Sequence, residues 1–200
     1  MSRDRRILPR FTIPLVLLIV CFTISACADV ELTVDPSMNK RAEDEAIAKL
    51  RTSAEGGDAS AQNKLGLLYY EGTGVPQDYR QAKQSFEEAA KQGHTGAQTN
   101  LGTLYLNGEG APQSDRMALF WFNQAAEQGD ALACARLGLM YARGRGVLQD
   151  SIQAHMWYNL SAAHGETRSA EARDALAQRM TPAQIAEAQR LARKWKPKNK

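Results

Sequence analysis

The 200-residue chain has little of the chemistry that catalytic and metal sites use. It contains three cysteines and three histidines, no Cys-x-x-Cys or Gly-x-Ser-x-Gly motif, and no two histidines at the spacing of metal ligands on a helix. We therefore expect no catalytic residue, no metal site and no cofactor. His94, His155 and His164 are expected to lie in loops or on the surface.

An excess of one charge is also missing once the first 26 residues are set aside. They hold four of the 25 basic and one of the 22 acidic residues, which leaves 21 of each in the remainder. This balance gives no reason to expect nucleic acid as a partner. The last eleven residues are rich in Arg and Lys, and we interpret them as the cationic end of a helix followed by a solvated basic tail over 197–200. Contact with an anionic lipid or polymer is the alternative.

Long hydrophobic runs are rare, and the clearest one extends from Phe11 to Ile24. Four arginines precede it and small residues follow it, which is typical of a secretory signal peptide, predicted here over 1–26. The run is short for a bilayer span of about 20 residues, so an uncleaved anchor is the least favoured reading. A simple cleavage after Ala28 is a second alternative.

The residues Ile24-Ser25-Ala26-Cys27 resemble a bacterial lipobox. The resemblance implies diacylation of Cys27 and a tether to the periplasmic side of the cell envelope; Cys21 fits less well because the bulky Val20 precedes it. Ala28 after the cysteine favours the outer membrane over the inner one. A soluble periplasmic or secreted protein is the alternative. The polar residues 27–42 are then expected to form a flexible tether with a reach of roughly 20 Å.

A block of 36 residues recurs three times without insertion. In the first block it is marked by Ala61, Leu65, Gly66, Tyr69 and Gly72, all of which return 36 and 72 positions later. Each block carries two apolar stripes at helical spacing, and neither helix alone could bury its apolar face. The blocks are therefore predicted to stack as repeats, over 59–94, 95–130 and 131–166.

Residues at the expected helix ends support this reading. Gly72 and its equivalents follow the first helix, where a left-handed conformation suits glycine. Asp78, Ser114 and Asp150 are expected to cap the second helix, with Gln81 and Gln153 completing capping boxes. The recurring glycine inside the first helix, at 66, 102 and 138, indicates a close approach between helices, because glycine there costs about 1 kcal/mol relative to alanine.

The recurring string Ala-x-x-x-Leu-Gly-x-Leu/Met-Tyr-x-x-Gly-x-Gly, followed by Ala-x-x-x-Phe/Tyr-x-x-Ala/Ser-Ala-x-x-Gly, resembles the Sel-one-like repeat family (SLR). The resemblance implies an all-α fold, an α/α solenoid of tetratricopeptide-like helix pairs. Half a repeat is expected over 43–58, and C-terminal capping helices over 167–196. Thr181, Pro182 and Gln184 would open the last helix with a capping box.

Two non-repeating positions are interpreted as packing. Trp121 and Trp157 stand where the first repeat has Ser85, and we favour core packing over a sugar-stacking platform for them. Cys134 takes the place of Gln62 and Gln98, and we expect a packed or partly exposed, unreactive thiol there.

The first helices of tetratricopeptide-like arrays line the concave side, and their non-repeating positions are free of the packing constraint. The candidate partner-binding residues are Asn63, Leu67, Tyr70, Thr99, Thr103, Leu106, Ala135, Leu139 and Ala142. This mild mixture of apolar and neutral polar groups suits a protein or peptide partner better than a charged polymer.

The sequence thus favours a non-enzymatic scaffold or adaptor of the bacterial cell envelope that binds a protein partner. The alternative is a cell-wall or exopolysaccharide-related binding protein or hydrolase, which a pair of inward-facing carboxylates would favour.

Overall fold

The computed structural model describes residues 36–198, and within them all regular structure is α-helical. The chain divides into two compact units, residues 1–40 and 41–200, and the second holds most of the first helix and all of the others. The helices are α2 (Pro36–Glu55), α3 (Ala59–Glu71), α4 (Tyr79–Lys91), α5 (Thr95–Asn107), α6 (Asp115–Glu127), α7 (Ala131–Arg143), α8 (Ser151–Ala163), α9 (Thr167–Ala177) and α10 (Pro182–Lys194).

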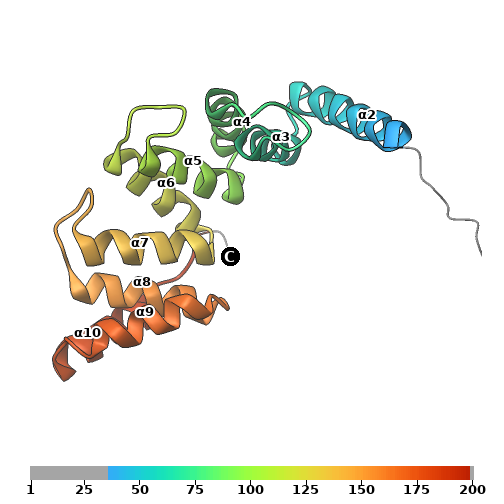
Figure 1. Ribbon diagram of the computed structural model, residues 1–200. Helices are drawn as coiled ribbons and strands as arrows, with labels where there is room; N and C mark the ends of the chain where they lie inside the picture. The colour runs from blue at the N-terminus through green and yellow to red at the C-terminus, as the bar shows by residue number, and fades with distance from the viewer. Residues whose placement is uncertain (1–35, 199–200) are drawn as a thin grey trace, which may run out of the picture. The chain divides into compact units, whose positions relative to one another are not determined.

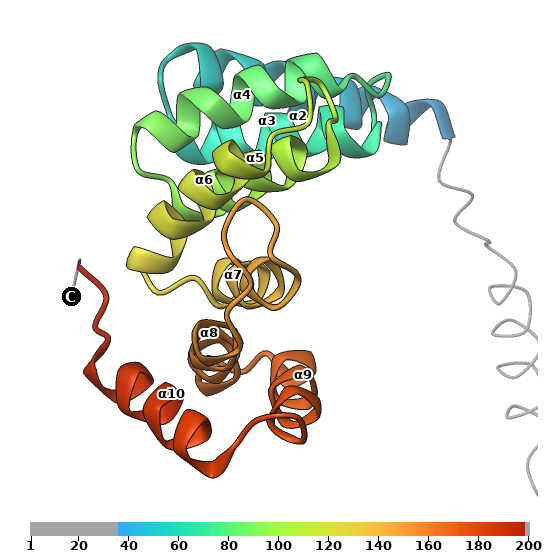
Figure 2. The same ribbon diagram turned by 90° about the vertical axis from the view of Figure 1, so that its left-hand side faces the viewer.

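Consecutive helices of the second unit pack in pairs, and each pair packs on the next (Figure 1). The pairs are α3 with α4, α5 with α6 and α7 with α8, joined by contacts of α4 with α5 and of α6 with α7. Both α9 and α10 pack against α8 (Figure 2). This arrangement confirms the expected all-α solenoid, because neighbouring pairs bury the apolar faces that no single pair could cover.

The helices of the repeats begin and end at the residues expected from the sequence. The Asp78 carboxylate accepts hydrogen bonds from two backbone N–H groups of α4, at 2.9 and 3.1 Å. Gly72 ends α3 in the left-handed conformation, with φ 74°. The capping box is made in full at Thr181 and Gln184. The reciprocal bond expected from the Gln81 side chain is not among the hydrogen bonds of the described residues.

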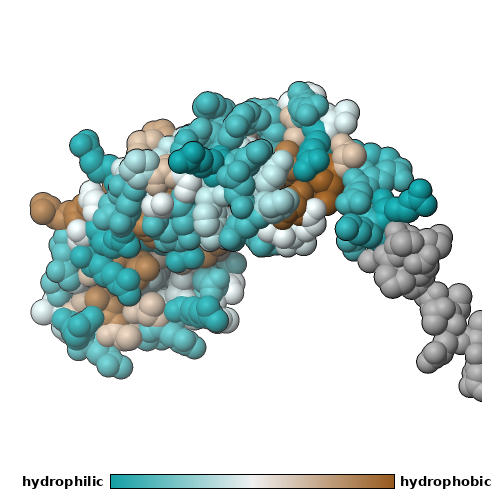
Figure 3. All heavy atoms as spheres, turned by 45° about the horizontal axis from the view of Figure 1, so that its top comes forward, coloured by the Kyte–Doolittle hydropathy of each residue, from teal (hydrophilic) through white to brown (hydrophobic). Residues whose placement is uncertain are grey.

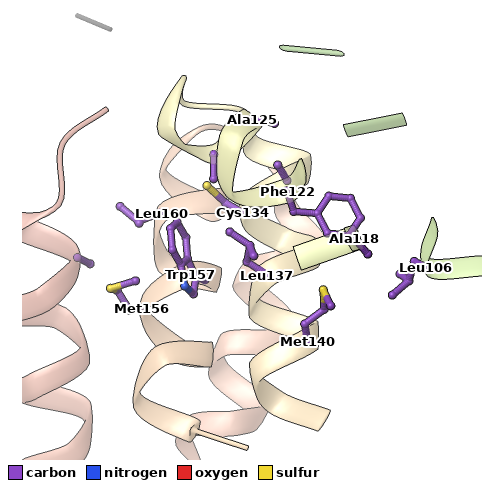
Figure 4. Close-up of a cluster of buried hydrophobic side chains, with 13 residues drawn as sticks. Leu106, Ala118, Phe122, Ala125, Cys134, Leu137, Met140, Met156, Trp157 and Leu160 are labelled. Carbon is purple, nitrogen blue, oxygen red and sulfur yellow. The ribbon is translucent and has the colours of Figure 1, made fainter. Parts of the chain in front are cut away.

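An aromatic ring fills the space left by the recurring glycine of each repeat, at 66, 102 and 138. A Cβ atom on Gly66 would lie 2.6 Å from the ring of Phe86, and one on Gly138 would lie 2.6 Å from the ring of Tyr158. Such distances are far below van der Waals contact, so the glycine is a steric requirement of the helix pair. The largest group of buried side chains extends from Leu106 through Phe122 and Leu137 to Leu160 (Figure 4).

Buried glutamines join one repeat to the next. Gln98 donates from Nε2 to the carbonyl oxygen of Ala90 at 3.3 Å and accepts from Nε2 of Gln128 at 2.7 Å. The first repeat makes the same two bonds with Gln62, Ala54 and Gln92. These bonds satisfy polar groups at the junction, which would otherwise cost about 1–3 kcal/mol each when buried.

The third repeat departs from this arrangement. Cys134 stands at the glutamine position and is fully buried, as expected of a packed thiol. Burial is the main cause that raises the pKa of this thiol to about 12, so it stays protonated and a poor nucleophile.

Helix α2 differs from the expectation. It begins at Pro36, so residues 36–42 of the predicted tether are helical; residues 27–35 lie outside the described part. Ala46, Ile47 and Leu50 of α2 line an apolar cavity of about 440 Å³ together with Leu68 of α3. Hydrophobic side chains are visible at this end of the array (Figure 3). A helix without a partner helix of its own leaves these groups partly uncovered.

The C-terminal residues turn back onto the repeats. The rings of Trp157 and Trp195 pack edge to face, with centroids 5.8 Å apart. The backbone N–H of Lys198 donates to the carbonyl oxygen of Glu127 at 2.8 Å, and its ammonium group pairs with the Glu127 carboxylate. The tail expected to be solvated is therefore attached to α6 at Lys198, because a carboxylate and a free carbonyl meet it there.

Candidate partner-binding groove

A groove runs along the first helices of the three repeats. One part is a cavity of about 170 Å³, lined by Leu67 and Tyr70 of α3, Thr103 of α5, and Leu132 and Arg136 of α7. The other part has a volume of about 310 Å³ and lies between α7 and α9. Both parts share Leu132 and Arg136. We call their combined surface the first-helix groove.

The groove is mainly apolar, and Arg136 lies at the junction of its two parts. Its other charged lining residues are Glu71, Glu166 and Arg168. Arg136 is partly buried, and its Nε atom is fully buried without a hydrogen-bond partner among the described residues. A buried guanidinium N–H without a partner is costly, so a carboxylate or carbonyl oxygen of a ligand would be bound favourably here.

Tyr70 forms the opposite wall near Arg136. Its ring packs edge to face against Tyr79, with centroids 5.5 Å apart. Burial raises the pKa of Tyr70, and the nearby Glu109 carboxylate raises it further, whereas Arg136 lowers it. The hydroxyl group therefore stays protonated, with the Glu109 carboxylate as its acidic neighbour.

Five of the nine predicted residues line the groove: Leu67, Tyr70, Thr103, Ala135 and Leu139. A sixth, Asn63, is partly buried and accepts a hydrogen bond from Asn100 of the next repeat at 3.1 Å. Ala142 packs beside the buried side chains of Ala154, Tyr158 and Leu176.

Thr99 and Leu106 are corrections to the predicted set. They are only 3% and 6% exposed, which leaves them little surface to offer a partner. Thr99 donates at 3.1 Å to the carboxylate of Asp130, which caps the first helix of the next repeat, and Leu106 belongs to the largest buried cluster. Both positions fail to repeat because they fit the neighbouring repeat.

The sequence reasoning missed Leu132 and Arg136. Leu132 is 44% exposed and stands where the other repeats have Ser60 and Gly96. An apolar residue replacing a small one at the start of a helix was a usable signal. Arg136 gave a weaker one, because the other repeats have Lys64 and Asn100 at its position.

The histidines lie in three different environments. His94 caps α5 by accepting the N–H of Ala97 on Nδ1 at 3.2 Å, and His164 is exposed. His155 is only 3% exposed, so its expected surface position is wrong. Burial lowers the pKa of His155, and the positive charge of Arg173 lowers it further. The α8 face that carries it is covered by α9, which the sequence pattern did not reveal.

Metal clusters and membrane-spanning helices are both absent from residues 36–198. No three His, Cys, Asp or Glu side chains in this range gather as a metal ion would require. No helix there is both long and apolar enough to cross a membrane.

Residues 59–94, 95–130 and 131–166 each match the family model described as Sel1 repeat. The chain belongs to the Sel1 repeat family. Sel1 repeat proteins generally mediate protein–protein interactions, and they are typically non-catalytic scaffolds. No curated protein matches the chain.

Two solved structures show how Sel1 repeats assemble in similar chains. A protective antigen present in uropathogenic Escherichia coli strains, which displays an SLR fold, is 34% identical, with a TM-score of 0.71 over 74% of this chain and 32% of that one. A Sel1 repeat protein from Oxalobacter formigenes is 36% identical, with a TM-score of 0.54 over 56% of this chain and 45% of that one. The chain thus spans less than half the length of either protein.

Proposed function

We propose that this Sel1 repeat protein is a non-enzymatic scaffold of the bacterial cell envelope that binds a protein partner in the first-helix groove. The observation that carries the proposal is the position of Arg136, whose Nε–H has no partner among the described residues and lies where the two parts of a mainly apolar groove meet. A polypeptide can complement both parts of this surface, with apolar side chains against its apolar walls and with carbonyl or carboxylate oxygens at Arg136.

The envelope location rests on the N-terminal sequence. Cys27 lies outside the described residues, and its lipobox is the basis for proposing an outer-membrane lipoprotein. A lipid there would hold the scaffold at the periplasmic surface. Cleavage without lipid would instead give a soluble periplasmic or secreted protein with the same groove.

Photo-crosslinking in the producing bacterium tests the groove. A benzophenone amino acid is placed at Thr103, on the groove wall, and for comparison at Arg116, an exposed position on the second helix α6. We expect a discrete crosslinked protein from Thr103 and none from Arg116. A partner captured reproducibly from Arg116 and never from Thr103 would overturn the proposed surface.

Charge reversal provides the matched test of Arg136. Arg136→Glu should reduce the Thr103 crosslink roughly tenfold or more, since a repulsive charge at a buried contact costs several kcal/mol. Arg116→Glu changes the net charge equally on another helix and should leave the crosslink intact. Equal yields from both variants would remove Arg136 from the binding site.

A further inference from the structure

A slot between second helices is filled in two repeats and open in one. The slot-filling residues are Trp121 and Trp157, and the equivalent residue of the first repeat is Ser85. Trp157 is 7% exposed and lies in the same buried cluster as Leu137 and Leu160 (Figure 4). Trp121 packs against the corresponding cluster of the second repeat, which includes Leu101.

At Ser85 the slot is a cavity of about 540 Å³ between α2, α3 and α4. Its lining includes Ala54 and Leu65, which stand 36 positions before Ala90 and Leu101 of the cluster that Trp121 covers. Leu65 is partly exposed, whereas Leu101 is completely buried. The first repeat therefore retains the apolar floor of an indole site but not the indole. We call this cavity the Ser85 slot.

The rim of the Ser85 slot is polar, unlike its equivalents. Gln84 and Glu88 stand where the second repeat has Phe120 and Gln124, and the Gln84 amide donates to the Glu88 carboxylate at 3.4 Å. The third repeat has Met156 and Leu160 at these positions. The Ser85 hydroxyl has no hydrogen-bond partner among residues 36–198. These groups offer acceptors for an indole N–H, which neither Trp121 nor Trp157 finds within the described chain.

A substitution on α2 adds donors at the same rim. In the second repeat the Tyr105 hydroxyl donates to the Glu87 carboxylate at 3.1 Å. Arg51 takes the place of Glu87 in the first repeat, beside Tyr69 in the slot lining. A tyrosine hydroxyl and a guanidinium group can both donate to backbone carbonyl oxygens on either side of an inserted side chain.

The slot is open enough to be entered from outside. Leu65 on its floor is partly exposed. Gly110 approaches the backbone of Tyr79 on α4, whereas the equivalent Gly74 meets only the side chain of Ile47 on α2. The chain's own tryptophans are already packed: Trp157 and Trp195 against each other, and Trp121 against its cluster. An indole for the slot must therefore come from another protein.

We propose that the Ser85 slot is a second protein-binding site, which accepts a tryptophan side chain from an extended segment of a partner. It shares no lining residue with the first-helix groove, so it stands or fails independently of the function proposed above. Tryptophan is among the residues that most often dominate the energy of an interface, because its large apolar surface is buried with one polar N–H to orient it.

Peptide binding followed by NMR tests this site. The probe is acetyl-Gly-Gly-Trp-Gly-Gly-amide, and the comparison peptide has Leu in place of Trp. We expect saturable shifts of the Ser85, Leu65 and Ala54 backbone amides with the Trp peptide, and binding weaker by roughly tenfold with the Leu peptide. Equal binding of both peptides, or no binding of either, would overturn the proposal.

Two variants show whether peptide binding needs an empty slot. Each adds one tryptophan, one inside the slot and one outside it. Ser85→Trp reproduces the residue of the other repeats, fills the slot and should abolish peptide binding. Arg80→Trp adds an indole at an exposed position of α4 outside the slot and should leave binding unchanged. Binding that persists in Ser85→Trp would refute the site. Arg136→Glu should leave peptide binding intact, which distinguishes this slot from the groove.

Discussion

A Cβ atom added to Gly102 would lie 2.7 Å from the aromatic ring of Phe122. Gly102 lies on α5 and Phe122 on α6, so this contact sets how closely the two helices of a repeat approach. The same relationship holds in all three repeats. It explains why glycine recurs inside a helix, although its low helix propensity destabilises the helix.

Replacement of Gly102 by alanine should therefore destabilise the array. Overpacking costs about 1–3 kcal/mol and the better helix propensity of alanine returns up to about 1 kcal/mol, so we expect a net loss of about 1–2 kcal/mol. The midpoint of urea denaturation measures it. Gly96→Ala is the matched control on the same helix, because its Cβ would meet no atom closer than 3.4 Å. A loss of equal size in both variants would contradict the steric explanation.

Filling the Ser85 slot should stabilise the first repeat. Ser85→Trp covers Leu65 and Ala54, and cavity-filling substitutions of this kind contribute about 0.5–2 kcal/mol. The converse change, Trp121→Ser, should cost about 3 kcal/mol, since it opens the same cavity in a packed repeat. Thermal denaturation of both variants gives the answer. A lower melting temperature for Ser85→Trp would show that an indole does not fit there.

The Cys134 thiol should resist alkylation in the folded protein. Its pKa of about 12 keeps it neutral, and it has no exposed surface. The protein is treated with iodoacetamide at pH 8, with and without urea, and the peptide that contains Cys134 is analysed by mass spectrometry. We expect Cys134 to be alkylated in urea and almost unmodified without it. Equal labelling in both conditions would place the thiol at the surface.

Cys134 should also make stability fall at alkaline pH. The unfolded chain loses the thiol proton near pH 9.0 and the folded chain only near 12, so the folded state holds the proton more tightly between these values. Unfolding is then favoured as pH rises through this window, by up to about 1.4 kcal/mol per pH unit. Cys134→Ala, which removes the titrating group, should show a smaller fall above pH 9 in denaturation experiments.

His155 should make stability fall on the acidic side. Burial holds its pKa below the ordinary value of 6.5, so below pH 6.5 the unfolded chain binds a proton that the folded chain does not. Stability therefore decreases as pH falls below 6.5. His155→Leu, which introduces the residue of the second repeat, should reduce this decrease. A pH profile unchanged by His155→Leu would argue against the buried site.

The lipid anchor has a direct chemical test. Metabolic labelling with a radioactive fatty acid should mark the wild-type protein and leave Cys27→Ser unmarked, since lipidation requires the cysteine thiol. Cys21→Ser is the control and should remain labelled. Label in Cys27→Ser, or none in the wild type, would reject the lipoprotein proposal.

The sequence by itself determined the helices and their order. Asp78 caps α4, Gly72 ends α3 and Gly66 faces Phe86. Each of these roles depends on residues close together in the sequence, and their spacing repeats every 36 residues. Because the same pattern occurs in three repeats, each helix boundary could be checked three times, and the fold could be predicted from the sequence.

Only the tertiary structure decided which non-repeating residues are available to a partner. Thr99 and Thr103 lie one turn apart on α5, yet Thr99 bonds to Asp130 while Thr103 lines the groove. Arg136 and Tyr70 come from different repeats, and the Ser85 slot is lined by α2, α3 and α4 together. Such outcomes depend on the angle and distance between neighbouring helix pairs, which are set by the packing of many side chains together and leave no periodic trace in the chain.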